Sequence, residues 1–408
     1  MRLPALQSRS FCLYEGGSLF ALNGQWITRI VVGWVGWELT GSATWVGLLS
    51  FFLFAPTIVT SPFFGVLVDR VRLKPTVLIS QGIVTLATLS LYILHLGGLL
   101  TIWSLSAVSL VIGIAGSAER AVRVTIVPRM VPLSALTNAV GIHATNFNVA
   151  RLVGPAIGGI LIERIGSGPT MLINFIVLLP FMVAVSFLKV NEKDGSKTER
   201  KSFLADFWSG ARVAARHPVI REAMVLTCIT SITVRGVLEI LPALADGEFH
   251  RGAEGLGQMV AASGAGALVS AVVVAIRHTR KRPGIPLIGH VAVFVGTVSV
   301  AGLGIAHTWL LAMLFVTLCG FAGTMIGINM QTTIQLTVDD NFRGRVMSLW
   351  MVAGIGLSSL GALLLGFLAD VFGLAETLIV GGIASALLSL AFRFANAPSI
   401  ARMERTAP

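Results

Sequence analysis

Charged residues are scarce in this chain. Only 12% of its 408 residues are Asp, Glu, Lys or Arg, whereas 55% are hydrophobic, and the mean hydropathy is +0.85. A soluble domain carries charge on about a quarter of its residues, because its surface must face water. Apolar runs of about twenty residues, the length that crosses the hydrocarbon core as a helix, recur along the whole chain. The composition excludes a soluble globular protein and predicts a membrane-integral one.

Motifs for metal binding and catalysis are also missing. The three cysteines, Cys12, Cys228 and Cys319, lie far apart in or near apolar runs, so their spacing predicts neither a disulfide nor a metal site. The sequence has no HExxH, GxSxG or Walker phosphate loop. We therefore expect no enzyme activity, no cofactor and no ATP hydrolysis. Any work this chain does must draw on an ion gradient or on a substrate gradient.

The excess of Lys and Arg over Asp and Glu is explained by the membrane topology of the chain. The formal net charge is +11, but no RNA- or DNA-binding motif accompanies it, so no nucleic-acid partner is expected. The N-terminal segment leads into an apolar stretch that contains Glu15 and has no small-residue cleavage site, which predicts an uncleaved first span. Lys and Arg concentrate in the connections that the positive-inside rule assigns to the cytoplasm.

Apolar runs between charged or Gly/Pro-containing breaks predict twelve membrane-spanning helices. The long connection 190–218 divides them six and six, which predicts an N-terminal bundle, a cytoplasmic linker, a C-terminal bundle and a cytoplasmic tail. The spans are 11–36, 45–67, 75–97, 100–125, 138–162, 169–189, 219–243, 254–276, 286–306, 309–335, 344–369 and 374–393; the four parts are 1–189, 190–218, 219–394 and 395–408.

Orientation follows from the positions of Lys and Arg. The side opposite the N-terminus receives only Arg164 and Arg251, so both termini are predicted to be cytoplasmic, in the inner membrane of a bacterium. Twelve helices can function as a monomer, and nothing in the sequence specifies a partner chain. The cations assigned to the cytoplasmic side are Arg70, Arg72, Lys74, Arg129, those of the central loop, Arg277, Arg280, Lys281, Arg282, Arg343 and Arg345.

The central loop contains a candidate helix. Within 203–216, Phe203, Leu204, Phe207 and Trp208 recur at helical spacing, with arginines nearby. This pattern is typical of an amphipathic helix lying on the inner leaflet of the bilayer. An ordinary linker helix would give the same pattern, so both interpretations stay open.

The two halves of the chain resemble each other at an offset of 207 residues. Glycines recur at this spacing, Glu163 corresponds to Asp370, and the basic loop at Arg70 corresponds to the one at Arg277. Two similar six-helix halves are the building plan of several transporter folds. The matching glycines are Gly154, Gly159 and Gly166 with Gly361, Gly366 and Gly373.

Four stretches carry a more specific resemblance. Residues 24–47 (GQWITRIVVGWVGWELTGSATWVG), 65–74 (GVLVDRVRLK), 141–159 (GIHATNFNVARLVGPAIGG) and 339–349 (DDNFRGRVMSL) resemble the major facilitator superfamily, in particular its branch of siderophore and macrolide exporters. In the second stretch Gly65, Asp69, Arg70 and Lys74 fit the pattern, while Arg72 and Leu73 depart from it. The resemblance implies an all-α fold of two pseudo-symmetric six-helix bundles.

The loop before the third span is a candidate cytoplasmic gate. The resemblance implies that Asp69 engages the start of the eleventh helix, where Arg343 and Arg345 are candidate partners. Such a contact would hold the cytoplasmic side closed and break when that side opens. The alternative is a basic loop that only fixes the topology.

The fifth span resembles the helix-five motif of antiporters. Gly154 and Gly158 form a GxxxG pair, which lets a neighbouring helix approach closely, and Pro155 predicts a kink. Close approach and a kink could seal one side of a cavity, although any tightly packed bundle uses small residues in this way. The motif positions are Gly141, Gly154, Pro155, Gly158 and Gly159.

Ionisable side chains within the spans are the candidate functional residues. Placing such a side chain in the membrane costs about 2.5–3.5 kcal/mol of free energy by insertion scales, unless it has a partner or contacts water. In the first span Glu15, Ser18, Gln25 and Arg29 share one face, which predicts a polar stripe toward a central cavity. Further candidates are Glu119, Arg120, Arg123, His143, Asn146, Asn148, Arg151, Arg235, Glu239, Asn329, Gln331 and Gln335.

Glu119 with Arg123 and Glu239 with Arg235 are each four residues apart and can pair within a helix. Such pairs are either self-neutralised groups near the surface or sites where an acid exchanges a proton when the pair is disrupted. We hypothesise that at least one of Glu15, Glu119 and Glu239 carries a coupled proton. His143 alone is more typical of a packed polar residue than of a proton relay.

The sequence favours a secondary transporter that exports a small amphipathic molecule of the drug or siderophore class by alternating access, in exchange for protons. A lysophospholipid flippase or an importer of the same fold is the nearest alternative. A non-transporting membrane sensor or scaffold is the alternative from another class, but it gives no reason to keep costly charges in the spans.

Overall fold

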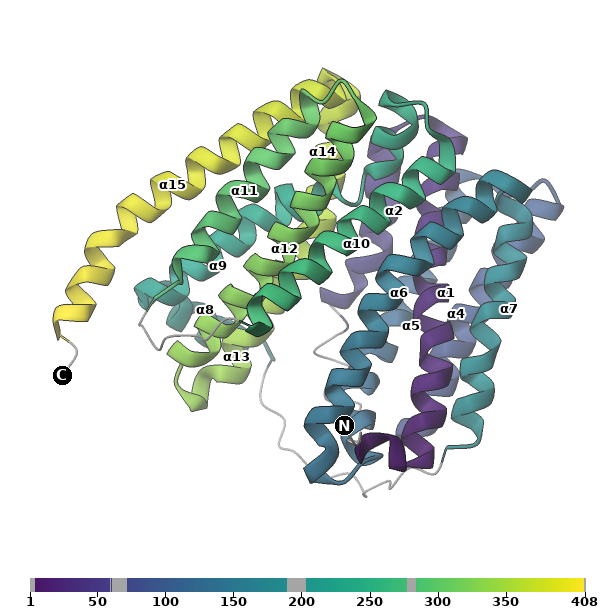
Figure 1. Cartoon of the computed structure of the whole chain (residues 1–408), viewed down its shortest axis with the longest axis horizontal. Coiled ribbons are helices and arrows are strands. Elements are labelled where there is room, and N and C mark those ends of the chain that lie inside the picture. The colour runs from purple at the N-terminus through teal and green to yellow at the C-terminus, as the bar shows by residue number, and fades with distance from the viewer. Residues whose placement is uncertain (1–3, 59, 61–71, 189–202, 277–283, 407–408) are drawn as a thin grey trace. The chain divides into compact units, whose positions relative to one another are not determined.

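The computed structural model describes residues 4–58, 60, 72–188, 203–276 and 284–406. Within these ranges the chain forms helices and connecting turns, with no strand (Figure 1). The longer helices are α1 (Arg9–Thr40), α2 (Ala43–Phe54), α4 (Leu73–Leu96), α5 (Ile102–Ile126), α6 (Leu136–Ile165), α7 (Ser167–Ser186), α8 (Phe203–Arg216), α9 (Pro218–Thr230), α10 (Gly252–Ile276), α11 (Leu287–Gly304), α12 (Trp309–Thr337), α13 (Asp340–Met351), α14 (Leu357–Phe372) and α15 (Leu374–Thr406).

The helices follow the predicted spans closely, which confirms the all-α membrane fold. Among the described residues, eight helices are long and apolar enough to cross a membrane, and the shorter apolar helix 43–58 adds to them. Helices α1 and α6 also have sufficient length, but polar residues such as Asn23, Gln25 and Asn146 lie along their middle parts and lower their hydropathy. These two helices carry much of the site described below.

The last helix differs from its predicted span. The sequence places the end of the twelfth span at residue 393 and a tail after it, whereas α15 continues as one helix to Thr406. Asn396 is 1% exposed and its amide donates to the Pro218 carbonyl oxygen at 2.9 Å, so this part of the helix is held against α9. A polar contact that the apolar pattern could not reveal therefore extends the element.

Three segments of the described chain form π-helix. The segment η4 (Ser231–Arg235) follows α9, η5 (Ala243–Glu248) precedes α10, and η6 (Val352–Gly356) joins α13 to α14. Such wider turns occur frequently at functional sites, because they change the direction in which side chains project. The segment η4 carries Arg235, one of the candidate residues.

The chain divides into two compact units. Unit 1 comprises Met1–Gly41, Phe52–Thr198 and Ala245–Ala261, and unit 2 comprises Ser42–Phe51, Glu199–Leu244 and Ala262–Pro408. The main boundary falls inside the predicted linker 190–218. The first part of α2 groups with unit 2, and the first part of α10 groups with unit 1.

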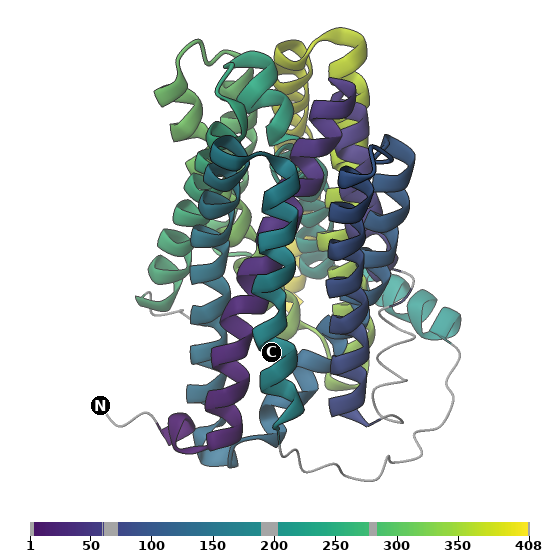
Figure 2. The ribbon, with the colours of Figure 1, turned by 90° about the vertical axis from the view of Figure 1, so that its right-hand side faces the viewer.

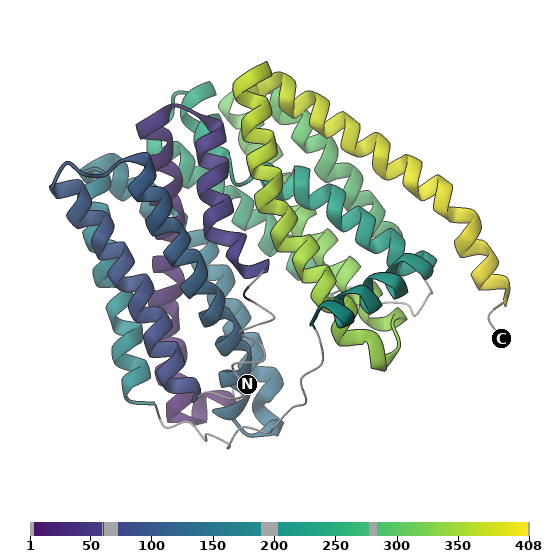
Figure 3. The same cartoon turned by 180° about the vertical axis from the view of Figure 1, so that it is seen from behind.

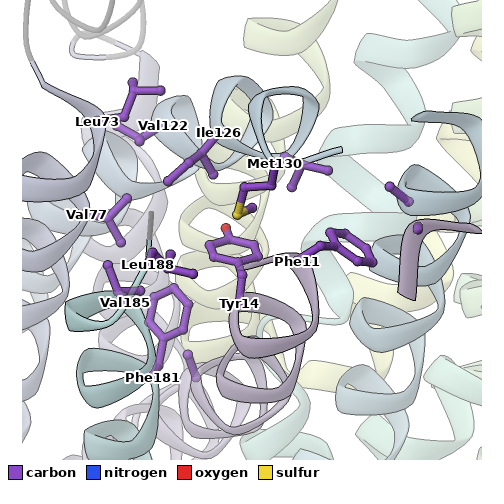
Figure 4. Close-up of a cluster of buried hydrophobic side chains, with 14 of the residues drawn as sticks. Phe11, Tyr14, Leu73, Val77, Val122, Ile126, Met130, Phe181, Val185 and Leu188 are labelled. Atoms are coloured by element: carbon purple, nitrogen blue, oxygen red, sulfur yellow. The ribbon is translucent and has the colours of Figure 1, made fainter. Parts of the chain in front are cut away.

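In unit 1, α1 packs along both α6 and α7, and α4 packs along α5 and α7 (Figures 1 and 2). Near the start of α1 a cluster of buried apolar residues fills the space between these helices. Figure 4 shows the Tyr14 ring of α1 next to Met130, with Phe181 of α7 on one side of Tyr14 and Phe11 of α1 on the other. Leu73, Val77, Val122, Ile126, Val185 and Leu188 complete the labelled part of this cluster.

In unit 2, α11 packs along α12 and α15, and α9 packs along α12 and α15 (Figure 3). The predicted amphipathic segment is the helix α8, which packs against α13 and α9. A Cβ on Gly210 of α8 would lie 3.1 Å from the backbone of Arg345 in α13. The segment is therefore packed on protein along one face, while Trp208 is 67% exposed.

The contact between α11 and α15 depends on glycine. A Cβ on Gly382 would lie 2.4 Å from the Ala301 backbone nitrogen and 2.7 Å from the Thr297 carbonyl oxygen. At the adjacent Gly381 a Cβ would meet only the Leu365 side chain, at an ordinary 3.6 Å. Small residues allow such backbone approach in a bilayer, where helix association relies on close packing.

We predict that Gly382→Ala lowers the thermal unfolding temperature of the protein in nanodiscs, since α11 and α15 must separate to admit the methyl group. Gly381→Ala is the matched control, and alanine should there stabilise the helix by up to about 1 kcal/mol through its higher propensity. Equal melting temperatures for the two variants would contradict this packing.

Candidate functional site

A buried ion pair lies at the centre of unit 1. Glu119 and Arg123 of α5 are 1% and 7% exposed. The Arg123 Nε donates to Glu119 Oε1 at 2.8 Å, and its Nη2 donates to the same oxygen. The intrahelical pair predicted from the spacing is confirmed, but it is buried and not at a solvated surface.

Helix α1 supplies the remaining partners of this pair. The Gln25 amide nitrogen lies 3.2 Å from Glu119 Oε1 and 3.0 Å from Oε2, so it donates to the carboxylate. The Ser18 hydroxyl oxygen accepts from Arg123 Nη1 at 2.5 Å. Part of the predicted polar stripe of α1 therefore faces α5, and both members of the ion pair have additional hydrogen bonds that offset their desolvation.

The apolar cluster of Figure 4 closes one side of the ion pair. The Arg123 guanidinium carbon lies 4.7 Å from the centroid of the Phe181 ring, within range of a cation–π interaction. Tyr14 contacts the same ring edge to face, with centroids 5.6 Å apart. Val122 and Ile126, which flank Arg123 on α5, belong to the same cluster.

A second buried acid, Glu15, lies three residues before Ser18 on α1, less than one turn away, but faces α6. The His143 Nδ1 lies 2.8 Å from Glu15 Oε1, and the Asn146 amide donates to Oε2 at 2.6 Å. The predicted stripe of α1 is thus divided between two neighbouring helices. His143, which the sequence predicts to be only a packed polar residue, has the carboxylate of a candidate acid as its partner.

The third polar group involves Arg29 and Arg120. The Arg29 guanidinium lies 5.0 Å from the Trp26 ring centroid and 5.2 Å from that of Phe54. Arg120 Nη2 donates to the Thr57 hydroxyl. The aromatic partners of Arg29 could not be identified from the sequence, because ring stacking between helices leaves no spacing signal.

In unit 2, the charges of Arg235 and Glu239 interact, and each side chain also has a hydrogen bond to another residue. Arg235 Nη2 donates to the Gly323 carbonyl oxygen at 3.2 Å, and the Ser50 hydroxyl donates to Glu239 Oε2 at 2.8 Å. The spacing of four residues predicts a helical pair, but the π-helical segment ends at Arg235 and Glu239 lies in a turn. Both side chains are half-buried.

The remaining polar candidates lie on α6 and α12. Arg151, Gln331 and Gln335 are half-buried. The Asn329 amide donates to the Met325 carbonyl oxygen one turn earlier at 2.8 Å, and the Asn148 amide donates in the same way to Ala144. These two asparagines are thus engaged with their own helices.

The helix-five motif brings backbones together. A Cβ on Gly154 would lie 2.8 Å from the Trp26 Cβ, and one on Gly159 would lie 2.6 Å from the Ala253 carbonyl oxygen in the first part of α10. Gly158 faces Ile27 and Ile30 at 3.5 Å, whereas Gly141 has open space around it. Helix α6 continues through Pro155. Close approach is therefore a property of the C-terminal half of the motif.

The repeat-related acids Glu163 and Asp370 each meet the start of another helix. Asp370 accepts from the Ser42 hydroxyl at 2.5 Å and from the backbone nitrogens of Ala43 and Thr44 at 2.9 and 3.0 Å, which caps α2. At Gly252, where φ is +59°, a Cβ would lie 2.7 Å from Glu163 Oε2 at the start of α10. A carboxylate at a helix N-terminus also interacts favourably with the helix dipole.

Part of the predicted gate lies outside the described residues, namely Gly65, Asp69 and Arg70. Lys74 donates to the Ser186 and Leu188 carbonyl oxygens at 2.7 and 3.1 Å, at the C-terminus of α7. Arg343 pairs with Asp340 at 2.6 Å, and the Arg345 guanidinium lies 5.4 Å from the Phe342 ring. The proposed contact with Asp69 stays a prediction.

We predict that the Glu119–Arg123 pair is strongly coupled energetically. Either Glu119→Gln or Arg123→Leu alone should destabilise unit 1 by about 3–5 kcal/mol, because it leaves an uncompensated buried charge. The double variant should cost less than the sum of the single variants, as measured by denaturation in mixed micelles. Additive effects would contradict the pairing.

We also predict that Asp370→Asn lowers the melting temperature, since the cap on α2 loses its charge at a cost of about 1 kcal/mol. Asp340→Asn is the control. Its side chain is 85% exposed and pairs only with Arg343, and such surface pairs contribute about 0–1 kcal/mol. An equal decrease in both variants would show that the cap has no particular role.

Comparison with known proteins places this arrangement in a family. The family model described as transmembrane secretion effector matches residues 4–407. The staphyloferrin A transporter of Staphylococcus aureus is 23% identical over 396 residues, covering 94% of this chain and 95% of that protein. The enterobactin exporter EntS of Citrobacter koseri is 26% identical over 360 residues, covering 86% and 80%.

Among solved structures, a bacterial homologue of the human lysosomal transporter Spinster superposes with a TM-score of 0.72 at 14% identity, over 97% of this chain and 98% of that one. At this identity the likeness shows the fold alone. Since the family model covers nearly the whole sequence, the chain belongs to the transmembrane secretion effector family and is a multi-pass membrane transporter with the major facilitator fold.

Proposed function

We propose that this chain exports a small amphipathic molecule of the siderophore or drug class across the bacterial inner membrane, by alternating access and in exchange for protons. The observation that carries the proposal is the buried Glu119, which is held between Arg123 of its own helix and Gln25 of α1. The siderophore class is supported by the relatives, which are named for staphyloferrin A and enterobactin.

The chemistry of Glu119 suits proton exchange. In the described state its carboxylate accepts hydrogen bonds from Arg123 and from the Gln25 amide, and the guanidinium of Arg123 offsets its charge. If α1 and α5 shift so that these donors move away, burial disfavours the charge and the acid takes up a proton. Substrate binding and proton binding would then favour different arrangements of the same two helices, which is the requirement for exchange.

The other acids rank below Glu119 in this proposal. Glu15 is 4% exposed but has a neutral or titratable partner in His143, and Glu239 is half-buried. Arg29 and Arg235 are cations within the helices that can attract an anionic substrate group, as siderophore carboxylates or catecholates would be. The protein acts as a monomer in this proposal, with both termini in the cytoplasm.

The contacts at Gly159 and Asp370 are the proposed seal on the side opposite the termini. Gly159 lets the backbone of the first part of α10 approach closely, and Asp370 caps the first part of α2. Both of these segments are therefore held in place. Asp69 and the start of α13 would form the corresponding latch on the cytoplasmic side. Opening of each side would require its own contacts to break.

The test uses purified protein in proteoliposomes that contain a pH-sensitive dye. A panel of staphyloferrin A, enterobactin, a macrolide, a cationic dye and lysolipid is added, and we predict that a siderophore or drug moves protons in the wild type. Glu119→Gln should abolish this proton movement, since the proton carrier is lost. Glu38→Gln is the matched control, because Glu38 is an exposed acid on α1.

Each of the other outcomes of this assay favours a different function. Movement of lysolipid without protons would indicate a flippase. Proton exchange that persists in Glu119→Gln would remove this residue from the mechanism and leave Glu15 and Glu239 to be tested. If no compound moves in the wild type while the protein remains folded, the export proposal is wrong and a sensor or scaffold becomes the better interpretation.

A further inference from the structure

Unit 2 contains a buried acid that the sequence analysis did not select. Glu222, in the second turn of α9, is 2% exposed. The Nε2 of His290, in the first turn of α11, lies 2.8 Å from Glu222 Oε1. The side chains of the two residues are 3% and 13% exposed, so the pair is almost completely removed from solvent.

Helix α15 completes the group. The Asn396 amide lies 3.3 Å from Glu222 Oε2 and donates to it, and the Asn396 side-chain oxygen accepts from Arg221 Nη2. Three helices that are distant in sequence therefore converge on one carboxylate. A lone buried polar residue would not need this many partners, so the group is a built site.

The second ring nitrogen of His290 also belongs to this site. This nitrogen, Nδ1, is buried and has no hydrogen-bond partner among the described residues. An unpaired buried ring nitrogen is costly. It is also the atom at which a neutral imidazole with its Nε2 proton directed at Glu222 would accept a further proton.

The position of Glu222 within the repeat makes it the counterpart of Glu15. The two residues are 207 apart, which is the offset that relates the two halves of the chain. Each is a buried glutamate near the start of the first helix of its half, and each contacts a histidine at 2.8 Å. The histidines come from non-equivalent helices, α6 and α11, so the similarity lies in the pairing and not in a copied local sequence.

The surroundings of Glu222 contain few other charges. Of the two elements α12 and η6, which both pack against α9, α12 carries one ionisable group, the buried thiol of Cys319, and η6 carries none. At the N-cap of α9, burial lowers the pKa of the His217 imidazole, and Asp339 partly opposes this effect. The other charged or titratable side chains that the structure describes on α9 and on the elements packed against it are Arg221 and Cys228 of α9, His290 of α11, Arg212 and Arg216 of α8, Arg235 of η4, and Glu376 and Arg393 of α15.

We propose that Glu222 and His290 form a proton-binding site in unit 2, the counterpart of the Glu15–His143 pair in unit 1. A hydronium ion transfers its proton to His290 Nδ1, so one O–H bond breaks as the N–H bond forms and a water molecule is released. The pair changes from a net charge of −1 to a neutral carboxylate–imidazolium pair. A neutral pair is favoured in a dry environment, because a single uncompensated charge is expensive there. A role for this proton in transport rests on the proposed proton exchange.

Proton binding is measured directly, without substrate. Full-length protein with isotope-labelled histidine is placed in nanodiscs, and its ring signals are followed by NMR from about pH 5 to 9, where histidine titrates. His290→Gln identifies the His290 signal among the seven histidines of the chain. In Glu222→Gln the carboxylate that pairs with the imidazole is gone, so the pH dependence of the His290 signal should differ from that of the wild type.

The control is Glu38→Gln, which should leave every histidine titration unchanged. A wild-type His290 signal that does not change with pH would overturn the proposal, and so would a Glu222→Gln variant with an unshifted titration. If Glu222→Gln does not fold, Asn396→Ala keeps both titratable groups but removes a donor to the carboxylate, and a shift of the His290 titration is still expected.

A second measurement separates this site from the proposed exchange mechanism. Protons moved per substrate are compared between the wild type and Glu222→Gln in the proteoliposome assay, and a lower ratio in the variant is expected. If the wild type moves no protons, the exchange proposal fails while the NMR titration still decides whether the site binds one. If the wild type exchanges protons and the variant keeps both the ratio and its pH profile, the site has no part in transport.

Discussion

The free energy of placing a charge among apolar helices constrains most of this structure. Each of the three buried glutamates that the structure describes lies next to groups that offset its charge or donate hydrogen bonds to it: Glu119 has Arg123 and Gln25, Glu15 has His143 and Asn146, and Glu222 has His290 and Asn396. Because the partner often comes from another helix, these bonds also determine which faces of α1, α5, α6, α9 and α15 meet. An interaction that satisfies a charge therefore serves at the same time as a specific contact between helices.

Glycine provides the complementary constraint, since polar partners can meet only if the backbones approach. Gly154 and Gly159 admit α1 and the first part of α10 to the surface of α6, and Gly382 admits α11 to that of α15. In a bilayer no hydrophobic gain drives helices together, so such close packing carries a large share of the association. The same glycines leave little space for adjustment, which suits contacts that are either formed or broken when a transporter changes state.

The candidate site could be predicted only in part from the sequence. Glu119 and Arg123 were found because a spacing of four residues on one helix is sufficient to bring two side chains together. The same spacing also brings the charges of Arg235 and Glu239 near each other, but it did not indicate the π-helical segment and the turn that replace the regular helix there. His143 and Glu222 were undervalued for another reason: their partners lie 128 and 68 residues away, and no periodic pattern carries that information.

The sequence by itself determined the membrane fold, the approximate ends of its helices, the internal repeat and the resemblance to major facilitator exporters. These properties follow from local hydropathy, helical periodicity and short motifs, all of which are written in neighbouring residues. Only the tertiary structure decided that Gln25 and Ser18 face α5 while Glu15 faces α6, that Asp370 caps α2, and that α15 continues far enough to bring Asn396 to Glu222. The physical reason is that the partner of a buried polar group is selected by geometry between distant helices, whereas the cost of burying it is a property of the residue alone.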